Sequence, residues 1–347
     1  MINIVSRSIA SGRTTGPQKV AVNLVKGLDR IGYPYVVNRD ISATRRLWIH
    51  DDHAALEYAH LSSACTVVGP NLYVMPENIP PHIRLDGMLY ILPGPTSAGH
   101  WRRLGFDRCD LSWWPVGIDT DECAPHAAPA NEARVMLYHK QRDSEELQRI
   151  ERTLSDAEID YRLVVYGAYD QSDYLSALKS TSFIVWHGCH ESQGIALQEA
   201  LSSGVPVLVC DIRTLDEERS QWDYGPVVGK FSGTAAPFFD ERCGLKIRDL
   251  AQLPDTLTRM RDRLADFRPR DYVIENLSLE KQAHDFVALW ERWDLDEASG
   301  HTEGMLNDRP LTEPWRHSVA SAPRRASQRV CRRLRRAQAD HSVLSDG

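Results

Sequence analysis

Short apolar runs alternate with longer stretches of helical periodicity in the first part of the chain. Residues 2–5 form an apolar run, residues 8–16 a loop rich in Ser, Gly and Thr, and residues 20–31 carry apolar side chains at helical spacing. This order predicts a strand, a loop and a helix. Further apolar runs bounded by Gly, Pro, Asn or Asp predict strands at residues 35–37, 47–49, 66–68, 88–92 and 111–116. The pattern therefore predicts a first α/β domain over residues 1–117.

A second series of the same kind follows an aperiodic stretch. Residues 118–132 are rich in Asp, Pro and Ala, which indicates a linker. The runs beyond it predict strands at residues 134–138, 162–166, 183–186 and 205–210 and helices near residues 145–154, 174–180 and 194–202. Alternating strands and helices favour parallel sheets, so we expect two Rossmann-like α/β domains, the second over residues 133–278, facing each other across a cleft. Ligands of such sheets bind at the carboxyl ends of strands, which makes that cleft the expected site.

The remaining residues divide into a helix and a tail. Apolar spacing over residues 279–295 predicts a final amphipathic helix, which we expect to pack back on the first domain. Residues 296–347 are rich in Gly, Pro, Ser and Arg and are expected to be disordered. Residues 316–336 contain many Arg and no acidic residue, so a weak, salt-dependent contact with an anionic surface is the alternative reading of this tail.

Composition narrows the class of protein and its compartment. The net charge of −7 argues against a general nucleic-acid coat protein. Seven cysteines without a CxxC pair fit reduced thiols better than disulfides or a zinc site. The N-terminal residues lack a signal-peptide pattern, and no run approaches the ~20 apolar residues of a membrane span. We therefore expect a cytoplasmic protein that is at most peripheral to a membrane.

The most informative passage is FIVWHGCHESQGIALQEALSSGVPVLVCD, residues 183–211. An apolar strand leads into Glu191, and a helix then opens at Gln193, Gly194 and Ile195. Free backbone N–H groups at such a helix start attract an anion, and small residues let a phosphate approach. Glu199 lies eight positions after Glu191, so the two carboxylates can accept hydrogen bonds from hydroxyl groups at different depths. The passage predicts a site for a diphosphate attached to a sugar and a ribose.

This passage resembles the group 1 retaining glycosyltransferases, which have the GT-B fold. The resemblance rests on Glu191, SQGIALQ, Glu199 and the GVPV strand at residues 204–207. The WPVGIDT run at residues 114–120, and Gly12 to Gly16 followed by a helix, also resemble that family. Its Gly-Arg and Lys-Gly diphosphate motifs are replaced here by YHKQR at residues 138–142.

The resemblance implies a nucleotide-sugar donor in the second domain, with Glu199 on the ribose and Glu191 on the donor sugar. The amides of Gln193, Gly194 and Ile195 would hold the phosphates, and Lys140 and Arg142 would stabilise the leaving diphosphate. His139 and Gly16 are further candidate donor ligands, and Asn71 is the candidate catalytic or acceptor-side residue, with His50 and His53 as alternatives. Transfer with retention, no metal and no cofactor are expected. The acceptor is a glycan, a lipid-linked sugar or a modified nucleobase.

Other readings of the same residues stay open. Glu191 and Glu199 also fit a helix-capping carboxylate and a solvated helix residue. Lys140 and Arg142 also fit ordinary surface cations, and Gly-Pro-Asn at residues 69–71 is a common turn. At the level of function, the alternatives are a sugar-nucleotide epimerase on the same fold and a non-catalytic sugar-nucleotide-binding protein.

Overall fold

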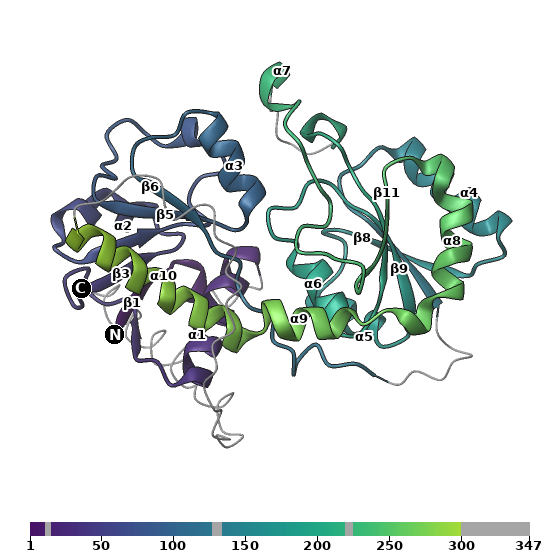
Figure 1. Cartoon of the computed structure of the whole chain (residues 1–347), viewed down its shortest axis with the longest axis horizontal. Coiled ribbons are helices and arrows are strands. Elements are labelled where there is room, and N and C mark those ends of the chain that lie inside the picture. Colours follow the sequence, from purple (N-terminus) through teal and green to yellow (C-terminus); the bar gives the residue numbers. More distant parts are fainter. Residues whose placement is uncertain (11–14, 127–133, 219–224, 300–347) are drawn as a thin grey trace, which may run out of the picture. The chain divides into compact units, whose positions relative to one another are not determined.

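The computed structural model describes residues 1–10, 15–126, 134–218 and 225–299. The chain divides into two compact units, Met1–Gly117 with the segment from Leu279 onward, and Ile118–Ser278. Each unit is built around a parallel sheet, which confirms the predicted α/β class (Figure 1). The Arg-rich stretch at residues 316–336 and Gly12 lie outside the described residues.

The first unit contains a six-stranded sheet in the order β2-β1-β3-β4-β5-β6, and every pairing is parallel. Its strands are β1 Ile2–Val5, β2 Tyr35–Val37, β3 Arg46–Ile49, β4 Cys65–Val68, β5 Met88–Leu92 and β6 Asp110–Trp113. Strand β6 ends before the predicted residue 116 because Pro115 has no backbone N–H to give to the sheet.

The helices of the first unit are α1 Gly16–Ile31, α2 His53–Tyr58, α3 Pro95–Arg103 and α10 Leu279–Ser299. Helix α10 comes last in the chain and packs against α1. At Gly27 a Cβ atom would lie 2.6 Å from the Leu279 carbonyl oxygen, so this glycine permits the close contact. Trp114 Nε1 also donates to the Gln282 carbonyl, 2.9 Å away. Helix α10 is therefore an integral part of the first unit.

The second unit contains a five-stranded parallel sheet in the order β11-β10-β9-β7-β8. Its strands are β7 Arg134–His139, β8 Tyr161–Val165, β9 Thr181–His187, β10 Val207–Cys210 and β11 Gly244–Ile247. Its helices are α4 Ser144–Asp156, α5 Gln171–Leu178, α6 Ile195–Ser202, α7 Gly225–Val228, α8 Leu253–Asp262 and α9 Pro269–Leu277.

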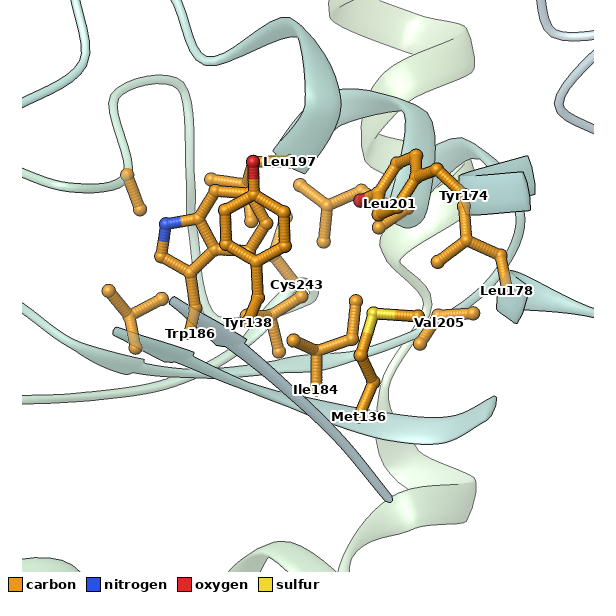
Figure 2. Packing of buried hydrophobic residues seen from close by; sticks show 14 of the residues in the cluster. Met136, Tyr138, Tyr174, Leu178, Ile184, Trp186, Leu197, Leu201, Val205 and Cys243 are labelled. Carbon is orange, nitrogen blue, oxygen red and sulfur yellow. The ribbon is translucent and has the colours of Figure 1, made fainter. Parts of the chain in front are cut away.

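Alternate residues of the second sheet face two different helix layers. Val135 and Leu137 pack with α4 and α8. Met136 and Tyr138 face the other way and pack with α5, α6 and α9 (Figure 2). On that face the rings of Tyr138 and Trp186 stack with centroids 3.9 Å apart. The two layers hold β7 and β9 side by side, so the residues that follow these strands are fixed in place.

The start of the expected linker is packed, not extended between the units. Ile118 and Cys123 are buried in the core of the second unit, and the Ile118 N–H donates to the Leu277 carbonyl. This packing differs from the predicted linker because Ile118 and Cys123 are apolar and become buried. The Asp and Pro residues around them made the segment resemble a linker in the sequence. Residues 127–132 lie outside the described residues. Within the described residues, no helix is both long and apolar enough to cross a bilayer.

Candidate functional site

The candidate site lies where the strand order of the second sheet turns back. The chain leaves β7 toward β8 on one side and returns to β9 on the other side of β7. Such a switch point leaves a crevice beyond the carboxyl ends of the two neighbouring strands. The register pairs His139 with His187, so the segments that begin at Lys140 and Gly188 leave the sheet side by side. These segments carry the candidate residues Lys140 and Glu191.

Lys140 and Glu191 form a largely buried ion pair at this point. The Lys140 Nζ atom lies 2.6 Å from Glu191 Oε1, and the two side chains are 15% and 13% exposed. Burial opposes the charge of the lysine, but Glu191 more than offsets it, so the pKa of Lys140 is raised and the ammonium stays charged. The Nζ atom also lies 4.5 Å from the centre of the Tyr166 ring. Two residues predicted separately from the sequence therefore meet in one contact.

Helix α6 opens next to this pair. Its N-cap, Gly194, has φ +79°, a left-handed conformation that favours glycine. Among the described residues no side chain caps this helix, and its first internal bond runs from the Gln198 N–H to the Gly194 carbonyl. The first turn therefore presents backbone N–H groups that can bind an anion. The Gln193 side chain is buried and donates to Gln198, so Gln193 can contribute to such a site only through its backbone.

Glu199 is a buried carboxylate inside α6. Gln171, the first residue of α5, donates from Nε2 to both carboxylate oxygens at 3.1 Å. Only 6% of Glu199 is exposed, which excludes the reading of a solvated helix residue. The contact fixes the carboxylate toward the carboxyl end of β8, since Gln171 follows that strand. Gln171 was not predicted as a site residue, because its contact is not local in sequence.

Arg142 does not lie with Lys140, contrary to the prediction that both cations face the diphosphate. Its guanidinium is buried and donates to Glu146 Oε2 at 2.7 and 3.2 Å. It also donates to the carbonyls of Gly188 and Cys210, at 3.3 and 3.4 Å. These bonds engage all three guanidinium nitrogens. Arg142 therefore fastens the ends of β9 and β10 to α4, which is a structural role.

His139 belongs to a polar chain on the same face as Arg142. His139 Nδ1 lies 3.1 Å from His187 Nδ1, and His187 Nε2 lies 3.1 Å from Glu146 Oε2. Burial lowers the pKa of both histidines, while the bond from His187 and the contact with Arg142 lower the pKa of Glu146 to about 2. The chain therefore ends on a charged carboxylate and two neutral imidazoles. Neither Glu146 nor the pairing of His139 with His187 was predicted from the sequence.

The loop that carries Glu191 is held by a second loop. The Glu191 N–H donates to the Thr234 carbonyl at 3.0 Å, and the His190 N–H donates to Glu218 Oε2 at 2.9 Å. Asp211 in turn accepts bonds from the Thr234 hydroxyl and the Ala235 N–H. At Gly188 a Cβ atom would lie 2.4 Å from Trp186 Nε1, so the loop passes directly over the indole. These contacts fix the backbone that presents Glu191.

The remaining predicted residues lie in the first unit. Gly16 opens α1, but Thr15 caps the helix by accepting from Gln18, and Pro17 has no N–H to donate. Few backbone N–H groups at the start of α1 are therefore available to bind a phosphate. Asn71 follows β4, and its Nδ2 atom lies 3.3 Å from Nε2 of the buried His50. The structure thus brings together Asn71 and one of its two predicted alternatives.

A separate cavity of about 350 Å³ opens at the carboxyl ends of β10 and β11. Acidic and basic side chains balance in its wall, among them Arg142, Glu146, Arg213, Glu217 and Arg248. Lys140 and Glu191 do not line it.

Within the described residues, no group of three His, Cys, Asp or Glu side chains could hold a metal ion. Burial raises the pKa of Cys189, which lies near Lys140, to about 12, so this thiol stays protonated.

Comparison with known proteins bears on the fold. The chain matches no protein-family model and no curated protein. It is similar to the solved structure of a sucrose-phosphate synthase from Thermosynechococcus elongatus, with a TM-score of 0.51 and 12% identity over 85% of this chain and 99% of that one. The lipopolysaccharide outer core galactosyltransferase WaaB gives a TM-score of 0.50 and 11% identity over 84% of this chain and 99% of that one.

Both of these proteins are glycosyltransferases of the GT-B class. The fold of this chain is GT-B. The two parallel sheets, with six and five strands, are the two Rossmann-like units of that fold. At 11–12% identity the similarity identifies the fold alone. The roles of the residues in this GT-B chain therefore have to be argued from its own contacts.

Proposed function

We propose that this chain is a glycosyltransferase that moves a sugar from a nucleotide diphosphate donor to an acceptor with retention of anomeric configuration. One observation carries the proposal. A buried lysine–glutamate pair lies beside an uncapped helix start at the switch point of the second sheet. The lysine and the helix N–H groups suit a diphosphate, and the glutamate suits sugar hydroxyls.

The diphosphate would bind between Lys140 and the start of α6. When the bond from the sugar to the diphosphate breaks, its electron pair moves to the phosphate oxygen. A fixed ammonium and the amides of Gly194 and Ile195 stabilise that charge without reorganisation, each donor contributing ~10² to 10³ in rate. Lys140 is already charged and desolvated, so it is ready for this role. Arg142 supports the site from behind through the Gly188 carbonyl.

The two carboxylates would bind the two sugar rings of the donor. Glu191 lies next to Lys140, so it is assigned to hydroxyls of the transferred sugar. Glu199 is held by Gln171 beyond the end of β8, so it is assigned to the ribose hydroxyls. A carboxylate that accepts hydrogen bonds from hydroxyls contributes ~1.5 to 3 kcal/mol per bond to affinity.

Retention follows if the acceptor attacks on the face from which the diphosphate leaves. The acceptor oxygen forms its bond to the anomeric carbon while the departing phosphate oxygen takes the acceptor's proton. This chemistry uses no protein nucleophile, no metal and no cofactor. Asn71, beside His50 in the first unit, is the proposed acceptor-side residue. A glycan, a lipid-linked sugar and a modified nucleobase are all compatible acceptors.

An assay of nucleotide release over UDP-, GDP- and ADP-sugars tests the proposal. We expect slow release of the nucleoside diphosphate from at least one donor in the absence of an acceptor, and faster release with the right acceptor. Nuclear magnetic resonance of the product then reads the anomeric configuration. Formation of a sugar isomer without release would indicate an epimerase. Binding without either reaction would indicate a non-catalytic protein.

A further inference from the structure

The ammonium of Lys140 has a second contact besides Glu191. Its Nζ atom lies 4.5 Å from the centre of the Tyr166 ring and 2.6 Å from Glu191 Oε1. Neighbouring strand ends bring the lysine and the ring together. The Tyr166 N–H donates to the His139 carbonyl at 2.9 Å, and Lys140 follows His139 directly in the chain. The ammonium is therefore in contact with both a carboxylate and an aromatic ring.

Tyr166 differs from the other tyrosines near the site. The rings of Tyr138, Tyr169 and Tyr174 pack together, and each of their hydroxyls is hydrogen-bonded. Tyr166 is 51% exposed, and its hydroxyl has no hydrogen-bond partner among the described residues. Neither full burial nor a hydrogen bond explains an aromatic side chain here. The contact with the Lys140 ammonium does, because the electron-rich face of the ring attracts a cation.

The carboxylate and the ring hold the ammonium in different ways. Glu191 offsets the charge of Lys140 and takes one of its three N–H donors. The Tyr166 ring carries no net charge, so the lysine keeps its full charge and its other N–H donors for phosphate oxygens. Lysine is a flexible side chain, whereas stabilisation of a leaving diphosphate requires a cation in a fixed position. The ring can therefore fix the ammonium without competing with the diphosphate for it.

We propose that Tyr166 is a positioning residue whose ring holds the Lys140 ammonium against the diphosphate once sugar hydroxyls have replaced the ammonium at Glu191. The inference rests on the proposed function. When a free diphosphate is bound, no sugar hydroxyl occupies Glu191, and this carboxylate still holds Lys140. The ring therefore matters most when the complete donor is bound. In this role Tyr166 acts on the diphosphate only through Lys140.

The contact itself is tested without any ligand. In ¹H–¹³C spectra of protein labelled at the lysine ε-carbons, the ring current shifts protons above an aromatic face upfield. We expect this shift for the Lys140 ε-protons in the wild-type protein and in Tyr166→Phe, and its loss in Tyr166→Leu. The Lys140→Met variant assigns the signal by its absence. An identical Lys140 signal in the wild-type protein and in Tyr166→Leu would overturn the proposal.

The role in binding is tested by calorimetry with UDP, GDP, ADP and their sugar conjugates. We expect Tyr166→Leu to weaken the best-bound sugar nucleotide about 3- to 10-fold and the matching free diphosphate by less than about 2-fold. Tyr166→Phe keeps the aromatic face and should bind both within about 2-fold of the wild-type protein. The matched control is Tyr58→Leu, which removes another exposed tyrosine in the first unit and should leave both affinities unchanged.

A second background separates positioning of the lysine from direct contact between the ring and the ligand. In Lys140→Met, the further change Tyr166→Leu should alter sugar-nucleotide affinity by less than about 2-fold, because no ammonium is left to hold. The same loss in both backgrounds would overturn the positioning role and indicate that the ring stacks on the ligand. Equal binding to Tyr166→Leu and the wild-type protein would overturn it while leaving the proposed function intact. If no compound of this panel binds the wild-type protein, the proposed function fails together with the role of Tyr166 in it.

Discussion

Lys140 Nζ and Glu191 Oε1 lie 2.6 Å apart, although the residues are separated by two helices and two strands along the chain. The pairing keeps both of these largely buried charges satisfied. A donor supplies a substitute for each partner, since phosphate oxygens accept from the ammonium and sugar hydroxyls donate to the carboxylate. In the proposed function the same contact stabilises the second unit and would be exchanged for a ligand that carries both groups.

Breaking this pair from one side should cost stability. Because an unpaired buried charge remains, we expect Lys140→Met and Glu191→Leu each to lower the free energy of unfolding by about 3 kcal/mol. The double variant should lose clearly less than the sum of the two. Urea denaturation measures all three values. The matched control is Lys230→Met, since Lys230 and Asp216 pair on the surface, and it should change stability by less than about 1 kcal/mol. Additive losses in the double variant would show that the two charges do not depend on each other.

Arg142 should behave as a structural residue. Arg142→Met leaves Glu146 without its main partner and frees the Gly188 and Cys210 carbonyls, so we expect a loss of about 3 kcal/mol or more in unfolding free energy. Arg142→Lys should recover little, because an ammonium lacks the planar fork. Donor affinity of the folded variant, measured well below its melting temperature, should change less than about threefold. A tenfold loss of donor affinity at unchanged stability would contradict the structural role and indicate that Arg142 binds the diphosphate.

Glu199 is expected to matter for binding. We expect Glu199→Ala to lose ~1.5 to 3 kcal/mol of donor affinity, because the hydroxyls of the ribose lose a charged acceptor. Gln171→Ala should give a smaller loss, since Gln171 only fixes the carboxylate. Titration calorimetry with the bound nucleotide measures both. Glu275→Ala provides the control, because Glu275 pairs with Arg242 on an exposed face of α9. Unchanged binding in a folded Glu199→Ala variant would remove the ribose assignment.

The free energy of unfolding should fall in two steps as the pH is lowered. His139 and His187 have a pKa below the usual 6.5, so they bind fewer protons in the folded than in the unfolded state, and stability is lost as pH falls below about 6.5. Glu146, at about 2 against the usual 4.5, adds a second loss as pH falls from about 4.5 to 2. Urea midpoints from pH 8 to 3 measure both steps. The first step should shrink in His139→Gln. A midpoint that is constant between pH 7 and 5 would contradict the neutral histidine pair.

Most strands of the GT-B fold could be predicted from the sequence because they are buried on both faces. The short, continuous apolar runs at β1, β5 and β9 predict buried strands. Strand β11 was missed because its sequence, Gly-Leu-Lys-Ile, is short and half polar. Its Gly244 has φ +139°, and a Cβ there would lie 2.1 Å from the Val207 carbonyl oxygen, a constraint set by the neighbouring strand. Such a constraint is not visible in a local pattern.

The candidate site was predictable where its signal is local. Glu191, Gly194 and Glu199 lie within one strand–loop–helix passage, and the structure places them at the start of α6 and within it. The contacts of these residues could not be predicted, because Lys140 reaches Glu191 and Gln171 reaches Glu199 through strand register and helix packing. The contacts of Arg142 could not be predicted for the same reason. Two residues beyond Lys140, the chain has already turned toward α4.

A donor site built on Lys140 and Glu191 is tested most directly by calorimetric titration of UDP, GDP, ADP and their sugar conjugates into the wild-type chain and into the Lys140→Met/Glu191→Leu double variant. We expect at least one sugar nucleotide to bind the wild-type chain, and the folded double variant to lose at least tenfold in affinity for it. Thermal melting checks that the double variant is folded. Absence of binding to the wild-type chain across the panel, or equal binding to both proteins, would contradict a donor site built on Lys140 and Glu191.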